Sequence, residues 1–325
     1  MKNIIYNILK ILDKIYINPH LLIFGDYTGI ASFCFHTVFE NDKEKNNNHT
    51  LPNIGLTLDE YKYIFDFFKN NNYKFISTKD YKNLNHGDKC IHVTFDDGYF
   101  NTTKILPILK DYEIPIDFFI VGNNISNSNK FWWDIIYNKR ISEGKSADII
   151  DQEIMFLQRK TFEQIYSYII ENFGLNSYTT LSDLDRPMTE NELRQFSQNK
   201  LVSIGNHTFD HAILNNLSKN EIYNQIKKTQ DYLESIIGYY PNSFAFPNSY
   251  YKSEQFEILK SLDIEYAFCG DFRHNKIPRD LRGEKKYRIS RYGILSKREI
   301  NWQLKMIRAG ISPFIVAKEI KRLLF

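Results

Sequence analysis

Residues 91–98 of the chain read IHVTFDDG, a short run of β-branched and aromatic residues that ends in two aspartates and a glycine. Such a run is typical of a buried β-strand, and Gly98 permits the turn that ends it. In proteins that alternate strands with helices, loops at the carboxyl ends of the strands carry the catalytic groups. The sequence therefore predicts that Asp96 and Asp97 lie at the catalytic edge of an α/β fold.

The two adjacent aspartates need not share one task. Successive side chains at the end of a strand point in different directions. One carboxylate can therefore bind a cation while the other stays free to accept a proton.

A second motif has the same layout. Residues 201–204, LVSI, form another strand-like run, residues 205–206 break it, and His207 and His211 follow. We expect a helical turn here, because a four-residue spacing within such a turn brings both imidazoles to one face. One carboxylate and two imidazoles suit zinc, and also cobalt, nickel or ferrous iron, with positions left for water and substrate. Either motif alone is common at protein surfaces, whereas the two together predict a mononuclear metal site.

Further segments extend the pattern along the chain. The set reads FCFHTV at 33–38, TFDDG at 94–98, IDFFIVG at 116–122, HTFDH at 207–211 and FAFPNS at 244–249. In these motifs, from about Ile30 to about Leu295, the chain resembles the polysaccharide deacetylase superfamily, the group of the NodB homology domain and carbohydrate esterase family 4.

The resemblance implies a fold and a set of roles. The fold is an α/β distorted (β/α)7-type barrel, in which Asp97, His207 and His211 hold one divalent metal ion. We expect Zn²⁺, with Co²⁺, Ni²⁺ or Fe²⁺ as alternatives. The resemblance also implies that Asp96 is the general base and that the backbone amide of Asn248 stabilises the tetrahedral oxyanion.

Two positions depart from the family pattern. Many members carry an arginine two residues before the proline of the third motif, where this chain has Ala245. We expect Arg288 or Arg291, in a later strand-like run, to supply that positive charge. The family's late histidine, which protonates the departing amine, has no clear counterpart. His274 is the candidate, either as this general acid or as a solvated loop residue.

Two further residues are candidates for substrate contact. His36 ends the first predicted strand, where it contacts either the substrate or a neighbouring side chain. Trp132, with Trp133 beside it, either stacks on a sugar or packs against the barrel.

The expected organisation has three parts. An N-terminal amphipathic segment spans residues 1–29, and the deacetylase-like barrel spans residues 30–295 with a mostly helical insertion at 123–200. Basic amphipathic helices, broken at Pro313, form a C-terminal helical tail at residues 296–325. The tail packs on the barrel or makes a peripheral contact with an anionic membrane surface.

The composition limits which binding partners and which cellular compartment we expect. The 325 residues are 42% hydrophobic and 15% aromatic, which allows a large core. A net charge of +3 without a concentrated basic run excludes nucleic acid as an expected partner. Three cysteines without zinc-site spacing favour a reducing compartment. With no secretory signal at residues 1–24, we expect a cytoplasmic protein, at most peripheral to the inner membrane.

Three functional classes follow. The first is a metal-dependent hydrolase that removes an N-acyl group, acetyl rather than formyl, from an amino sugar in bacterial surface polysaccharide or glycolipid biosynthesis. Its substrate would be nucleotide-linked, lipid-linked or an oligosaccharide. The second is a non-haem Fe(II) oxygenase, because two histidines and one carboxylate also form its metal site. The third is a catalytically impaired carbohydrate-binding barrel, motivated by Ala245 and the missing late histidine.

Overall fold

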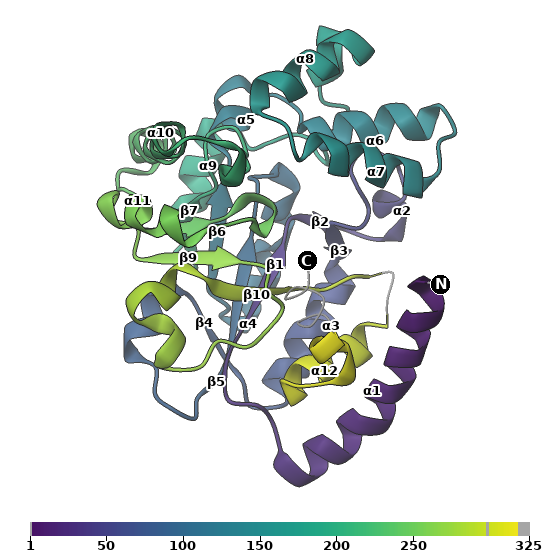
Figure 1. Cartoon of the computed structure of the whole chain (residues 1–325), viewed down its shortest axis with the longest axis vertical. Coiled ribbons are helices and arrows are strands. Elements are labelled where there is room, and N and C mark those ends of the chain that lie inside the picture. The colour runs from purple at the N-terminus through teal and green to yellow at the C-terminus, as the bar shows by residue number, and fades with distance from the viewer. Residues whose placement is uncertain (1, 297–298, 318–325) are drawn as a thin grey trace.

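The centre of the molecule is a closed barrel of parallel strands (Figure 1). The computed structural model describes residues 2–296 and 299–317, with side chains from Ile8 onward. Within these residues seven strands form the ring. Their order around the barrel is β1 (Gly29–Phe35), β10 (Ile289–Gly293), β9 (Tyr266–Cys269), β8 (Ser243–Ala245), β7 (Val202–Asn206), β6 (Ile116–Ile120) and β5 (Lys89–Phe95). The ring closes because β1 pairs with β10 on one side and with β5 on the other. The predicted (β/α)7-type barrel is confirmed.

Among the described residues, one further short strand joins the barrel sheet and two others form a separate small sheet. β4 (Lys74–Ile76) pairs with the first half of β5. Just after β1, β2 (Thr37–Phe39) pairs with β3 (Gly55–Thr57).

Alternation along β1 determines which side chains face the barrel interior. Phe35 packs against Tyr61 of α3 (Leu58–Lys69), on the outside of the barrel. Its neighbour Cys34 therefore faces inward, because successive side chains of a strand point to opposite faces. Most residues of the barrel strands are buried, as expected for parallel strands covered by helices on the outer face.

The register of the strands places the two aspartates. Phe35, at the end of β1, lies opposite Phe95, at the end of β5. Both strands thus end at one level, and Asp96 and Asp97 follow directly at the mouth of the barrel.

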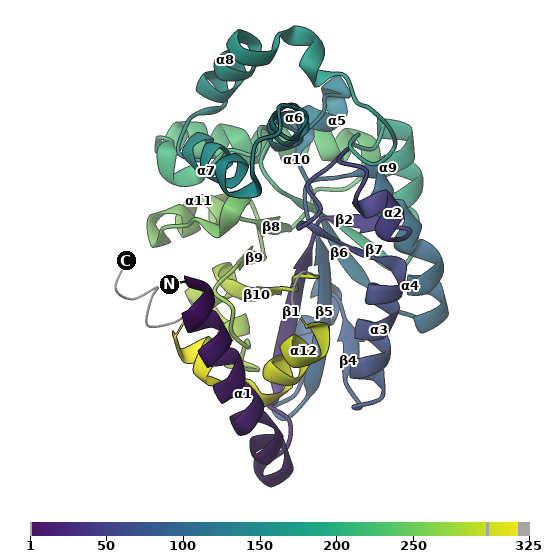
Figure 2. The ribbon, with the colours of Figure 1, turned by 90° about the vertical axis from the view of Figure 1, so that its right-hand side faces the viewer.

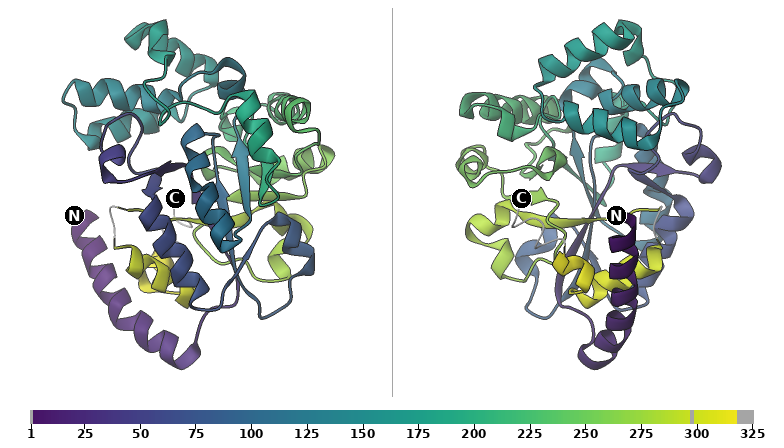
Figure 3. Two further views of the ribbon diagram at one scale, coloured as in Figure 1. Left: turned by 180° about the vertical axis from the view of Figure 1, so that it is seen from behind. Right: turned by 45° about the vertical axis from the view of Figure 1, so that its right-hand side comes forward.

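Helices cover the outside of the barrel (Figures 2 and 3). Besides α3, these are α4 (Leu106–Tyr112), α10 (Lys219–Ile237) and α11 (Phe256–Ser261). The short helix α2 (Asp42–Lys45) lies beside β2 and β3 instead.

The segment between β6 and β7 is mostly helical. It contains α5 (Gly122–Asn127), α6 (Trp132–Ser142), α7 (Ala147–Leu157), α8 (Phe162–Phe173) and α9 (Glu190–Ser197). The helices α6, α7 and α8 gather at one end of the barrel in every view (Figures 1 and 3). This is the end with the aspartates, because Trp133 of α6 packs against His211, with ring centroids 4.7 Å apart.

The two ends of the chain pack together on the barrel. The helix α1 (Lys2–Phe24) lies beside α12 (Ile300–Ala309) (Figure 2). Asp13 of α1 accepts hydrogen bonds from Trp302 Nε1 at 3.2 Å and from the backbone N–H of Phe314 at 3.0 Å.

The break in the C-terminal segment lies earlier than predicted. The helix α12 ends at Ala309, and Gly310 follows with a φ of 69°. Pro313 instead begins the next helical stretch, residues 313–317. Proline suits the first turn of a helix, and glycine suits the left-handed position after one. Residues 318–325 of the predicted tail lie outside the described residues. No helix within the described ranges has the length and apolarity needed to cross a membrane.

Candidate metal centre

The aspartates after β5 diverge because the backbone turns sharply between them. Asp97 has a φ of 76°, and Gly98 follows with a φ of 102°. The carbonyl oxygen of Asp97 accepts a hydrogen bond from the N–H of Val121 at 3.1 Å, which holds this turn against the end of β6. This backbone turn explains why the neighbouring carboxylates of Asp96 and Asp97 point to different partners, as predicted.

Asp97 faces two imidazoles. Its Oδ1 lies 3.6 Å from His207 Nε2 and 3.5 Å from His211 Nε2. Asp97 and His207 are buried, and one ligand atom from each of the three residues lies within 4.8 Å of the others. Asp97 Oδ1 has no hydrogen-bond partner among the described residues. Burying such an oxygen is costly unless a cation or donor meets it.

The two histidines come from a loop, so the predicted helical turn is wrong. Residues 207–211 form no helix. Thr208 and His211 have φ values of 65° and 52°, which a right-handed helix does not contain. The side chain of Asn206 holds the loop instead: its Oδ1 accepts from the N–H of Thr208 at 2.9 Å, and its Nδ2 donates to the carbonyl of Ile226 at 2.8 Å.

The orientation of His207 leaves one ring nitrogen for a ligand. Its Nδ1 lies 2.8 Å from the carbonyl oxygen of Ala245. A carbonyl can only accept, so Nδ1 carries the hydrogen and Nε2 presents a lone pair towards Asp97. Ala245, at the family's arginine position, thus contributes through its backbone.

A buried chain of hydrogen bonds supports His211. Trp133, which packs on the His211 ring, donates from Nε1 to the Tyr99 hydroxyl at 2.7 Å. Tyr99 donates in turn to Asp134 Oδ2 at 2.6 Å, and Thr50 donates to Asp134 Oδ1 at 2.8 Å. Trp133 therefore sits in a fixed position at the edge of the cluster.

The electrostatics of the cluster suit a divalent cation. Burial lowers the pKa of both His207 and His211, so both rings stay neutral. Burial raises the pKa of the Asp97 carboxyl, and the neighbouring charge of Asp96 raises it further. One carboxylate and two neutral imidazoles, aimed at a common point, fit zinc, cobalt, nickel or ferrous iron.

Asp96 is engaged by an arginine from another strand. Arg291 donates from its two terminal nitrogens to the two oxygens of Asp96, each at 2.7 Å, and also donates to Thr94 Oγ1 at 2.9 Å. Burial alone would raise the pKa of Asp96, but the charge of Arg291 and its hydrogen bonds hold that pKa well below its usual range. Asp96 is therefore an ionised, oriented carboxylate beside the cluster, 3.9 Å from His207 Nε2.

A second group of potential ligands, Cys34, His36 and Asp96, adjoins the first. Cys34 Sγ donates to Asp96 Oδ2 at 3.3 Å. Burial raises the pKa of the Cys34 thiol and lowers that of His36 to about 4. Since Arg291 already holds both oxygens of Asp96, the group around Asp97 fits a cation better.

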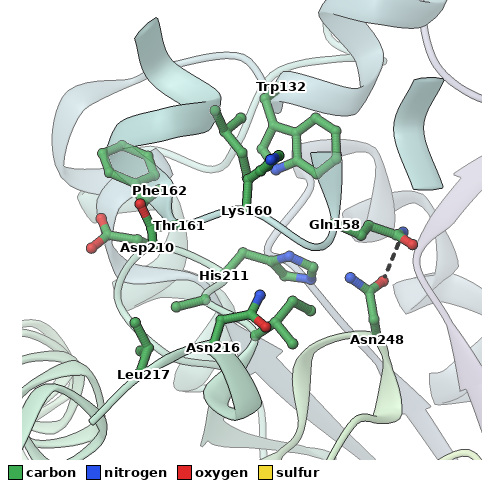
Figure 4. A pocket seen from close by; sticks show the side chains of 13 residues that line it. Trp132, Gln158, Lys160, Thr161, Phe162, Asp210, His211, Asn216, Leu217 and Asn248 are labelled. Carbon is green, nitrogen blue, oxygen red and sulfur yellow. Dashed lines mark hydrogen bonds between the residues drawn. The ribbon is translucent and has the colours of Figure 1, made fainter. Parts of the chain in front are cut away.

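Two further predicted site residues line a pocket beside His211 (Figure 4). Trp132, at the start of α6, and Asn248, after β8, face this pocket from different elements. Asn248 has a φ of 53° and accepts a hydrogen bond at Oδ1 from Gln158 Nε2 at 3.2 Å.

The structure does not bring Arg288 or His274 to this site. Arg288 is exposed just before β10. His274 is buried, with Nδ1 2.9 Å from the Tyr292 hydroxyl and its ring packed against Tyr27. The next residue, Asn275, pairs with Ile30 at the amino end of β1, away from the mouth.

The sequence analysis did not identify three features of the site. These are Cys34 beside Asp96, Asn206 as the support of the histidine loop, and the packing of Trp133 on His211. Alternation along residues 29–35 indicates that Cys34 shares the inward face with Ser32. No local pattern indicates the other two, because their partners lie on distant elements.

Comparisons with known proteins agree with this geometry. A family model described as polysaccharide deacetylase matches residues 83–267, more than half of the chain. A comparison with curated protein sequences found no match.

Solved structures share the fold. The deacetylase PplD of Streptococcus pyogenes, in complex with acetate, is 16% identical, with a TM-score of 0.57, over 86% of this chain and 98% of that chain. IcaB from Ammonifex degensii is 15% identical, with a TM-score of 0.57, over 88% of this chain and 99% of that chain. BC0361, a polysaccharide deacetylase from Bacillus cereus, is 12% identical, with a TM-score of 0.59, over 87% of this chain and 70% of that chain. At such identities these likenesses show the fold alone.

The family match, which spans both metal-motif segments, and the barrel that carries those segments lead to one assignment: the chain belongs to the polysaccharide deacetylase family.

Proposed function

We propose that this protein is a metal-dependent hydrolase that removes an N-acyl group, acetyl rather than formyl, from an amino sugar. One observation carries the proposal: the buried cluster of Asp97, His207 and His211 lies beside Asp96, which Arg291 keeps ionised. A cation site and a separate base are what hydrolysis of an unreactive amide requires.

The three residues of the cluster would hold the cation, with zinc as the expected metal. A divalent cation supplies a Lewis acid for the amide carbonyl and lowers the pKa of bound water towards about 7. The cluster's own residues orient it, since Ala245 holds His207 and Trp133 packs on His211.

Asp96 acts as the general base. It accepts one proton from the attacking water as the bond to the carbonyl carbon forms. Arg291 fixes both carboxylate oxygens, so the base is aimed before the substrate binds. When the carbon–nitrogen bond breaks, the departing amine needs one proton, and protonated Asp96 is positioned to return it.

The backbone N–H of Asn248 is the proposed donor to the oxyanion. Asn248 lies in the same pocket as His211, and its left-handed backbone sets the direction of the turn that carries it. A donor aimed at a developing oxyanion lowers the barrier more than it tightens substrate binding.

Arg291 also weighs against an impaired barrel that only binds carbohydrate. The positive charge missing at Ala245 reaches Asp96 from β10 instead. Family membership weighs against an oxygenase. The nucleotide-linked or lipid-linked substrate, the role in surface polysaccharide or glycolipid biosynthesis, the cytoplasmic location and a membrane contact through the tail stay predictions.

The test measures acyl release and metal content together. Purified protein is incubated with nucleotide-linked, lipid-linked and oligosaccharide N-acetyl sugars, and released acetate or formate is quantified with and without a chelator. We expect chelation to abolish release, and metal to restore it under both aerobic and anaerobic conditions. Asp96→Asn should keep its metal and lose at least about a hundredfold in kcat, whereas Asp97→Asn should lose both metal and activity.

Asp59→Asn, the same chemical change on an exposed position of α3, is the matched control and should behave as the wild type. Release at the wild-type rate from Asp96→Asn would refute the assigned base. Release that survives complete metal removal would refute metal dependence.

A further inference from the structure

The outer side of α1 is apolar and exposed. Ile15 is 67% exposed and Leu22 is 87% exposed, although both are large aliphatic residues. They belong to a row that we call the α1 stripe, which consists of Ile8, Ile11, Leu12, Ile15, Leu22 and Ile23. Spacings of three, four and seven residues place this row on one side of the helix, over about 22 Å.

The opposite side of α1 packs on the molecule. Asp13 and Ile17 are buried, and Asp13 accepts hydrogen bonds from Trp302 and Phe314. The stripe therefore points away from the core, and α1 runs along the outer margin of the molecule (Figures 1 and 2). A continuous apolar surface of this kind, left outside the core, marks an interaction site.

Lysines border the stripe on one side. Lys10 and Lys14 lie 3.0 Å and 2.9 Å from the same oxygen of Glu299. On the same side, Lys305 of α12 donates to Asn18 Oδ1 at 3.3 Å. These side chains carry three positive charges and one negative charge. The only acidic residue of α1 itself is the buried Asp13.

Aromatic side chains border the stripe on the other side. The ring of His20 lies 5.1 Å from the ring of Tyr16 and 5.1 Å from the ring of Phe24, measured between centroids. The Tyr16 hydroxyl is also 3.0 Å from His20 Nδ1. Amphipathic aromatic rings collect where a membrane meets water.

These three features together are typical of a helix that lies in the plane of a bilayer surface. The aliphatic stripe suits the acyl chains, and lysine stems can follow the apolar surface while their ammonium groups reach lipid phosphates. A protein partner would need a groove to enclose a ridge on the margin of the molecule. A bilayer needs none, because its surface deforms around the helix.

We propose that α1 docks this protein on an anionic lipid bilayer, with the α1 stripe inserted among the acyl chains and Lys14 and Lys305 at the headgroups. The docking surface is α1 itself and does not depend on residues 318–325. It is also independent of the proposed hydrolysis, so either proposal can fail without the other.

The experiment measures co-sedimentation of the full-length protein with phosphatidylcholine vesicles, prepared with and without phosphatidylglycerol. A series of lipid concentrations gives the partition coefficient. We expect binding to the anionic vesicles and weaker binding to the neutral ones. Ile15→Glu and Leu22→Glu should each lower the partition coefficient at least about tenfold, because each removes one aliphatic side chain from the bilayer. Lys14→Gln should lower it by about fivefold, and only on anionic vesicles.

Leu175→Glu is the matched control. It makes the same change of charge at a leucine that is 63% exposed, between α8 and α9. It should bind vesicles as the wild type does. Because the substituted side chains are exposed, all of these variants should keep the wild-type unfolding midpoint.

Insertion of the stripe has a spectroscopic test. Ile15→Trp places an indole in the stripe, and its fluorescence should shift to shorter wavelength when anionic vesicles are added. The wild type, whose tryptophans at 132, 133 and 302 are buried, should show no such shift.

Four outcomes would overturn the proposal. The first is a wild-type protein that does not sediment with anionic vesicles, and the second is Leu22→Glu that binds as the wild type does. The third is an equal loss in Leu175→Glu, which would leave net charge as the cause. The fourth is a dimer in lipid-free buffer that Leu22→Glu dissociates, without vesicle binding, which would assign the stripe to a second copy of the chain.

Discussion

Arg291 is the residue on which the electrostatics of the site depend most. The guanidinium is buried and spans both oxygens of Asp96, with Thr94 as a third partner. A buried carboxylate without such a partner would take up a proton. The pairing therefore supplies beside Asp96 the positive charge that was expected from Arg288 or Arg291.

Replacing Arg291 should change the pH dependence of catalysis as well as its rate. In Arg291→Gln, burial of Asp96 is no longer opposed by a positive charge, so its pKa rises and the acidic limb of kcat/KM moves to higher pH. Leaving the carboxylate unpaired also costs about 3–5 kcal/mol of stability. Arg291→Lys keeps the positive charge but cannot donate to both oxygens of Asp96 at once. We therefore expect kcat to fall about tenfold to a hundredfold, while the acidic limb of the pH profile moves little. The measurement is kcat/KM between about pH 4 and about pH 9, a range that covers the titration of carboxylates and imidazoles.

Arg288→Gln provides the control, because Arg288 is exposed near the start of the same strand. Its profile should match the wild type. If the acidic limb of the Arg291→Gln profile stays at the wild-type pH, the electrostatic role of Arg291 is contradicted. Arg291 would then contribute to the site only through packing.

At the scale of elements, the loop after β7 places both histidine ligands. Its shape depends on Asn206, a buried residue at the end of the strand that bridges Thr208 and Ile226. Thr208 in turn accepts at Oγ1 from the N–H of Ala212 at 2.9 Å. The two imidazoles meet because side-chain hydrogen bonds stabilise a left-handed backbone, and helical periodicity plays no part.

Asn206→Ala should therefore weaken metal binding without removing a ligand. We expect the affinity for zinc to fall about tenfold to a hundredfold, the usual effect of losing a group that orients ligands. Stability should fall by about 1–3 kcal/mol, since two buried backbone groups lose their partner. Competition with a chromophoric chelator, well below the unfolding temperature, measures the affinity.

Asn242→Ala is the matched control, because Asn242 is exposed and its side chain donates only to Glu265, at 3.4 Å, among the described residues. Equal zinc affinity in the two variants would show that the backbone alone holds the loop.

On the scale of the whole molecule, the two chain ends complete the fold. The helix α1 meets α12 through Asp13, a buried carboxylate that accepts from Trp302 and Phe314. Burial raises the pKa of Asp13. These contacts join segments from near the two ends of the chain through one buried acceptor.

Asp13→Ala should lower the free energy of unfolding by about 2–4 kcal/mol, because two buried donors lose their acceptor. Denaturant unfolding followed by tryptophan fluorescence measures this change.

Lys14→Ala, one residue further along α1, removes only an exposed ion pair with Glu299 and should cost less than about 1 kcal/mol. If the two variants lose equal stability, α1 packs on the barrel without depending on Asp13.

Local features of the sequence determined the strands, the motif ends and the choice of ligand residues. The run that ends at Asp96 and Asp97 contains residue types that favour a β-strand, and a glycine that permits a turn follows it. Carboxylates and imidazoles are metal ligands by their residue type, whatever the surrounding sequence. Each of these properties is carried by a few adjacent residues. The barrel was predicted from the resemblance of the combined motifs to a known family, and the expected metal cluster of Asp97, His207 and His211 lies together as the motifs indicated.

Only the tertiary structure decided which distant groups meet. Register on β10 turns Arg291, and not Arg288, towards Asp96. His274 lies by the amino end of β1, although its place in the sequence offered it as an acid. The helices α1 and α12 pack together although they lie near opposite ends of the chain. Contacts of this kind join residues hundreds of positions apart, and local sequence patterns carry no record of such pairings.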